Sequence, residues 1–122
     1  MPQADPYDDI PKKSAKTTLS VRIGTARIEN PKAATVFCDT LQRMGLDRVS
    51  RLGLSVSGLP LVSQNAPARK RSYRELDGWF VITHSSTRDK KATLEQAAEF
   101  LGIPIDVRIA LWSDMRLNWL LD

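Results

Sequence analysis

The sequence contains little of the residue types on which disulfides and metal sites depend. Among its 122 residues there is one cysteine, Cys38, and one histidine, His84. A single cysteine cannot form an internal disulfide, and the chain has none of the Cys/His spacings of structural zinc sites. We therefore expect neither a metal nor another cofactor, and the sparse cysteine content favours a cytoplasmic location.

Long apolar runs are also missing. No stretch approaches the roughly 20 apolar residues that a membrane-spanning helix needs. The chain does not open with the charged and apolar regions of a signal peptide. We expect no association with a membrane.

Motifs of common enzyme classes are absent as well. Neither a glycine-rich phosphate loop nor the Gly-x-Ser-x-Gly nucleophile elbow occurs. A hydrolase would need His84 as a base beside Ser85, Ser86 or Asp89, and neighbours on one loop rarely reach the geometry of a catalytic triad. The sequence therefore predicts a protein that is not an enzyme.

Length and composition indicate one domain preceded by a tail. Residues 1–17 contain three of the seven prolines and few apolar residues, which is typical of disorder. The remaining residues, 18–122, can bury a core as a single domain.

Alternating apolar and polar residues predict several strands. Turns are expected at Gly24-Thr25 and Asp77-Gly78. The alternation favours strands at 19–23, 26–29, 59–63, 79–83 and 105–111, with a short strand or turn at 49–52.

Two main helices are expected from their capping residues. The first has Asn30 as its N-cap and Pro31 at its first position, and it ends at Gly45. The second has Thr87 as its N-cap and ends at Gly102. On the first helix the cysteine lies beside the apolar stripe, where we expect it to be a small core hydrophobe.

The order of these elements indicates an α+β fold: a small, mostly antiparallel sheet with two main helices and a short C-terminal helix. That last helix, within 112–121, is expected to be capped by Ser113. Its Trp112, Met115 and Trp119 would share one face. The segment either docks on the domain or, if exposed, forms a homodimer surface.

The most informative segment is 79–102. A strongly apolar strand runs into a hydroxyl-rich loop, and the loop runs into a helix whose first turn holds Arg88, Lys90 and Lys91. A helix N-terminus already carries partial positive charge, so cations there cost a few tenths of a kcal/mol each. A chain that accepts this cost is expected to bind an anion there, with phosphate as the first candidate.

Positive charge is concentrated around this segment. Residues 69–91 hold seven cations against three anions, a balance as large as the +4 net charge of the whole chain. A solvated face accounts for such a cluster as readily as a nucleic-acid partner does. The short polar side chains of the loop suit base edges or phosphates, which favours duplex DNA as the partner. The expected contacts are Arg69, Lys70, Arg71, Arg74, Arg88, Lys90 and Lys91 on phosphates, and His84, Ser85, Ser86 and Thr87 on bases or in a groove.

The residues around the loop follow a recognisable order. An aromatic pair, Trp79-Phe80, is followed by Val81-Ile82-Thr83, by Thr87 and by Lys90-Lys91. This order resembles the C-terminal DNA-binding domain of the SeqA replication modulators and related bacterial restriction-associated domains. The resemblance implies binding of duplex DNA, with asparagines of the loop on base edges and basic residues on phosphates.

At the two asparagine positions of that pattern this chain has His84 and Ser86. Asparagine pairs bidentately with adenine, whereas serine is less selective. We therefore expect contact with the nucleic-acid backbone before the reading of any particular base.

A second hypothesis is a protein-interaction module. In that case the apolar segment 112–121, or a sheet edge, would bind a partner or a second copy of the chain. The two hypotheses are compatible with each other. A substitution such as Trp119→Asp separates them, because loss of a dimer without loss of DNA binding would assign the interaction role to this segment.

Overall fold

The computed structural model describes residues 17–68 and 73–112. Its elements follow in this order: β1 (Thr17–Ile23), β2 (Ala26–Glu29), α1 (Ala33–Met44), α2 (Leu46–Ser50), β3 (Ser55–Val56), β4 (Leu59–Pro60), β5 (Val62–Ser63), β6 (Tyr73–Leu76), β7 (Trp79–Ile82), α3 (Thr87–Leu101) and β8 (Ile105–Leu111). The α+β class predicted from the sequence is confirmed.

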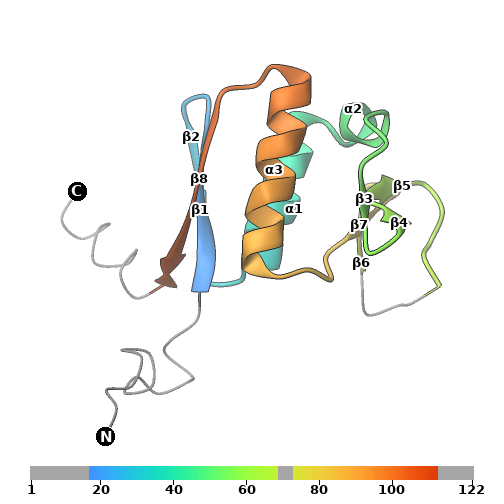
Figure 1. Cartoon of the computed structure of the whole chain (residues 1–122), viewed down its shortest axis with the longest axis horizontal. Helices are drawn as coiled ribbons and strands as arrows, with labels where there is room; N and C mark the ends of the chain where they lie inside the picture. The colour runs from blue at the N-terminus through green and yellow to red at the C-terminus, as the bar shows by residue number, and fades with distance from the viewer. Residues whose placement is uncertain (1–16, 69–72, 113–122) are drawn as a thin grey trace, which may run out of the picture.

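Helices α1 and α3 form the middle of the domain (Figure 1). A sheet with the order β2-β1-β8 lies on one side of them, and the short strands β3 to β7 lie on the other. All pairings between the strands are antiparallel. The strands are divided among three small sheets, however, and the single sheet that we expected does not form. Helices α1 and α3 lie between the sheet β2-β1-β8 and the short strands β3 to β7, so these strands cannot pair with one another.

The core forms where the first sheet meets the helices. Leu19 and Val21 of β1 are fully buried, and Val107 of β8 lies opposite Val21 in the register. Phe37 of α1 and Leu94 of α3 are fully buried in the same cluster. The alternation of β1 is what allows this packing, since every second side chain points to the same face.

Cys38 belongs to this core, as predicted. It is 1% exposed, and burial raises the pKa of its thiol from 9.0 to about 11. A thiol with a pKa this high is protonated at neutral pH and is a poor nucleophile.

The start of α1 differs from the prediction. The Asn30 side chain accepts a 2.9 Å hydrogen bond from the backbone N–H of Lys32, and Lys32 is the N-cap of a helix that begins at Ala33. Asn30 therefore closes a turn of its own before the helix, because its short side chain reaches the N–H two residues on. The predicted ends of both main helices are confirmed: Gly45 caps α1, and Gly102 caps α3 in the left-handed conformation.

The middle of the chain differs from the prediction in several places. Strand β3 was not expected, and the strand expected at 59–63 is divided into β4 and β5. Residues 46–50 form the helix α2, where part of a strand or turn at 49–52 was expected, and β6 at 73–76 was not predicted at all. The hairpin of β6 and β7 closes on Asp77 and Gly78, whose φ angles are 51° and 84°. Two positive φ angles in a two-residue loop favour this Asp-Gly pair, which was the expected turn.

Several sequence predictions concern residues that the structure does not describe. These are the tail up to residue 16, the basic residues Arg69, Lys70 and Arg71, and the C-terminal helix with its proposed dimer surface. Within 17–68 and 73–112, the helices are too short or too polar to cross a lipid bilayer.

Candidate nucleic-acid interface

The candidate site begins at the end of β7, the middle strand of the sheet β5-β7-β6. Val81 is fully buried and Ile82 is 1% exposed. The backbone N–H of Ile82 donates a 2.9 Å hydrogen bond to the carbonyl oxygen of Leu61. The buried end of the strand therefore holds the start of the following loop, residues 83–86, in a fixed position.

The aromatic pair of β7 is divided between the two faces of the strand. Trp79 packs against the hydrophobic core. Phe80 packs edge-on against Tyr73 of β6, with 5.3 Å between ring centroids and 75° between ring planes. This split follows from the alternation of the strand, and it engages both rings within the fold.

Lys90 of α3 holds the loop through hydrogen bonds to oxygen atoms of the loop. Its Nζ donates hydrogen bonds to the carbonyl oxygen of Thr83 (2.8 Å), to the carbonyl oxygen of Ser85 and to the Ser85 hydroxyl (3.2 Å). The same Nζ lies 5.8 Å from the centroid of the Phe37 ring, within the range of a cation–π contact. Lys90 is 5% exposed.

This burial changes the role expected of Lys90. All three ammonium donors have oxygen acceptors in the loop, so no donor is left over for a phosphate. Burial lowers the pKa of Lys90 from its ordinary value. The cation at the positive end of α3 is therefore offset by loop carbonyls, and its presence there does not by itself require an anion from outside.

The N-cap of α3 is Ser86, one residue before the predicted Thr87. The Ser86 hydroxyl accepts a 3.0 Å hydrogen bond from the backbone N–H of Asp89, three residues on. Asp89 also places a negative charge in the first turn, where it interacts favourably with the helix dipole. Both candidates have a hydroxyl, and only the backbone conformation of the loop decides which one caps the helix.

The other described cations are not equally available. Lys91 forms a 2.9 Å ion pair with Glu95, one turn further along α3. Arg74 donates a 2.9 Å hydrogen bond to the Thr35 hydroxyl on α1. Arg88 is exposed, and it makes no hydrogen bond or ion pair with any residue of the described ranges.

A polar groove of about 280 Å³ lies beside the loop, between α3 and the hairpin of β3 and β4. One wall contains Ser55, Val56 and Ser57 of the hairpin, and Ser57 has a positive φ of 53° at its tip. The loop and α3 supply the rest of the lining: His84, Ser85, Asp89, Ala92, Thr93 and Gln96. The hairpin wall was not predicted from the sequence, and the Ser57-Gly58 pair at its tip is the turn signal that could have revealed it.

The described end of the predicted basic segment 69–74 lies in the strand that pairs with β7. Tyr73, the first residue of β6, lies opposite Ile82, the last residue of β7, and Arg74 lies opposite Val81. The antiparallel register thus places Arg74 beside the strand that leads into the loop, although the two are several residues apart in the sequence.

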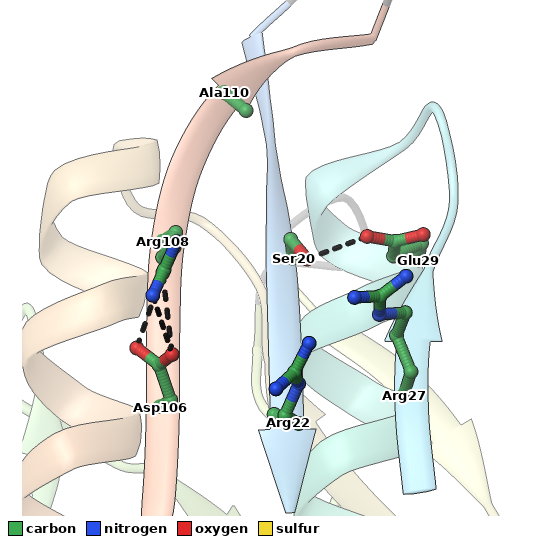
Figure 2. A pocket seen from close by; sticks show the side chains of 7 residues that line it. All are labelled: Ser20, Arg22, Arg27, Glu29, Asp106, Arg108 and Ala110. Atoms are coloured by element: carbon green, nitrogen blue, oxygen red, sulfur yellow. Dashed lines mark hydrogen bonds and ion pairs between the residues drawn. The ribbon is translucent and has the colours of Figure 1, made fainter. Parts of the chain in front are cut away.

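A second polar surface covers the outer face of the sheet β2-β1-β8 (Figure 2). Ser20 donates a 2.6 Å hydrogen bond to Glu29, and Arg108 forms a 3.2 Å ion pair with Asp106. The two remaining cations in this shallow, 140 Å³ hollow are Arg22 and Arg27. None of these side chains was predicted as part of a site, although the alternation of β1, β2 and β8 places them together on the outer face.

Among residues 17–68 and 73–112, no three His, Cys, Asp or Glu side chains come together as a metal site would require. Comparison with known protein families, with curated proteins and with solved structures found no match to this chain.

Proposed function

We propose that this domain is a non-enzymatic DNA-binding module that contacts the duplex through the loop 83–86, the first turn of α3 and the basic segment 69–74. The resemblance of the sequence to the SeqA-type DNA-binding domains motivates the choice of partner. The structure supports the proposal through the exposure and hydrogen bonding of the side chains that could contact DNA.

The observation that carries the proposal is a loop whose backbone is fixed by hydrogen bonds on its inner side and whose outer side chains are exposed to solvent. Lys90 and the Ser86 cap fix the loop backbone, while His84, Ser86 and Arg88 are exposed. A loop that is ordered before binding loses little conformational entropy when a ligand arrives. This is a favourable arrangement for contacts with a fixed array of phosphates and base edges.

The burial pattern divides the predicted contacts by role. Arg88 is the direct phosphate contact of the described residues, together with Arg69, Lys70 and Arg71 of the neighbouring segment. Lys91 joins them by exchanging Glu95 for a phosphate, whereas Lys90 and Arg74 hold the site in shape. The groove carries the charge of Asp89, so it suits base edges and sugars better than phosphates.

A salt series of duplex-binding measurements tests the proposal. Fluorescence anisotropy of a labelled duplex should show affinity falling linearly with salt on logarithmic axes, because cations released from the phosphates drive binding. Arg88→Ala should weaken binding to all sequences and reduce the magnitude of the slope by about one unit.

Arg43→Ala is the matched control, since Arg43 is an exposed arginine in the last turn of the other main helix. It should leave both the affinity and the slope unchanged. Absence of duplex binding at low salt would refute the proposal, and so would equal effects of the two substitutions.

A further inference from the structure

We propose that β8 pairs with β8 of a second copy of this chain, which extends the sheet β2-β1-β8 across a two-fold axis into a continuous sheet of six strands. The sheet β2-β1-β8 lies on the other side of the helices from the short strands β3 to β7 (Figure 1), and its pairing does not rest on the proposed DNA binding.

Strand β8 presents an exposed edge. It is the last strand of its sheet, and no strand of the described ranges pairs with its other side. At seven residues, Ile105–Leu111, it is far longer than the edge strand β2 and contains neither proline nor glycine. An unprotected edge of this length has a row of free backbone donors and acceptors that can pair with another strand.

Opposite charges alternate with apolar residues along β8. Asp106 and Arg108 both lie on the outer face of the sheet (Figure 2). An antiparallel pairing centred on Val107 puts Asp106 of each copy directly opposite Arg108 of the other. Opposite charges in directly opposed positions stabilise a pair of strands.

Neighbouring registers lack this match. Centring the pairing on Arg108 puts two arginines opposite each other, and centring it on Asp106 opposes two aspartates and brings Pro104, which has no backbone N–H, into the ladder. Shifting to Ile109 leaves Arg108 opposite Ala110. The charges thus select one register among those that keep the helix-covered faces of both sheets on the same side.

The inner face of the sheet favours the same pairing. Ile109 is 41% exposed, one of two exposed large hydrophobic residues in the described ranges. It lies opposite the fully buried Leu19 in the sheet, on the face that packs against the helices. In the register centred on Val107, Ile109 of each copy lies opposite Ile105 of the other. The pairing that matches the charges therefore also covers the exposed isoleucine.

The pairing also accommodates Arg22 on the outer face. Arg22 of β1 lies opposite Asp106 within one copy. In the dimer the Asp106 carboxylate would lie between Arg22 of its own chain and Arg108 of the second copy. Each carboxylate then has a cation on both sides, and the hollow of Figure 2 becomes part of one continuous charged face.

Charge complementation with the 122-residue chain tests this pairing. Analytical ultracentrifugation should detect a concentration-dependent dimer of twice the 13.7 kDa chain mass. Asp106→Arg alone and Arg108→Asp alone should each weaken self-association roughly tenfold or more, because both cross-strand pairs become repulsive. A mixture of the two variants should associate again, since each then supplies the charge that the other lacks.

Arg43→Asp on α1 controls for charge reversal elsewhere and should leave the dimer intact. Unfolding curves for each variant separate loss of pairing from loss of folding, and recovery in the mixture excludes misfolding. A chain that stays monomeric at its highest soluble concentration would overturn the proposal. A dimer broken by Trp119→Asp but insensitive to both β8 substitutions would also overturn it.

Discussion

The Nζ atom of Lys90 donates a 2.8 Å hydrogen bond to the carbonyl oxygen of Thr83, which ties the first turn of α3 to the end of the preceding strand. The two residues lie on either side of the loop that the sequence singles out. Lys90 was predicted to contact DNA. Because its ammonium group is bonded to the inner side of the loop, Lys90 instead supports the residues that are expected to contact DNA.

Removing the charge of Lys90 should destabilise the fold. Lys90→Met keeps an unbranched apolar stem near Phe37 and leaves the Thr83 and Ser85 carbonyl oxygens without their donor. The expected loss is about 1–3 kcal/mol in the free energy of unfolding, measured with urea. Lys91→Met is the matched control, with an expected loss below about 0.5 kcal/mol, because Lys91 contributes only a surface ion pair with Glu95. Equal losses would contradict the support role of Lys90.

The cap of α3 should depend on Ser86 and not on Thr87. Ser86→Ala removes the acceptor of the Asp89 N–H and should cost about 1 kcal/mol of stability. Thr87→Ala replaces the first helical residue with a better helix former and should cost little or nothing. A larger loss for Thr87→Ala in thermal or urea unfolding would show that the cap lies where the sequence suggested.

The buried thiol of Cys38 should make stability fall at alkaline pH. Its pKa is raised from 9.0 to about 11, so between these values the unfolded chain loses a proton that the folded chain retains. Stability from this group is complete below pH 9 and is lost as the pH rises towards 11, by about 2–3 kcal/mol. The measurement is a series of urea unfolding curves across this range for the natural chain and for Cys38→Ala.

In that series the Cys38→Ala variant starts less stable, because it loses buried volume. It should nevertheless lose less stability than the natural chain between pH 9 and 11. Parallel pH dependence of the two proteins would mean that the thiol does not stay protonated in the fold.

The groove beside the loop should contribute to DNA binding. Gln96→Ala removes an exposed amide from its lining and should lower affinity for a duplex without changing stability. Glu99→Ala, on the same helix but outside the groove, should leave affinity unchanged or raise it slightly, because it removes a negative charge. If Gln96→Ala binds duplex DNA as well as the natural chain does, the groove is not part of the interface.

Local patterns were sufficient for much of the fold. The alternation of β1 and β8, the Asp77-Gly78 turn and the glycine ends of α1 and α3 depend on neighbouring residues alone. The segment 46–63 was harder to predict, because its strands are only two residues long and have no period to detect. Strand β6 was missed because its YREL sequence is half charged, and it becomes a strand by pairing with β7.

The site shows the same division between local and tertiary information. Spacing and residue type alone predict that a polar loop follows a buried strand and leads into a helix with a basic first turn. Which of the cations remain free depends on tertiary packing, since Lys90 is buried against Phe37 of α1 and Arg74 contacts Thr35 of the same helix. Burial depends on residues distant in the chain, and for this protein it separates the charge that shapes the loop from the charge that is available to a ligand.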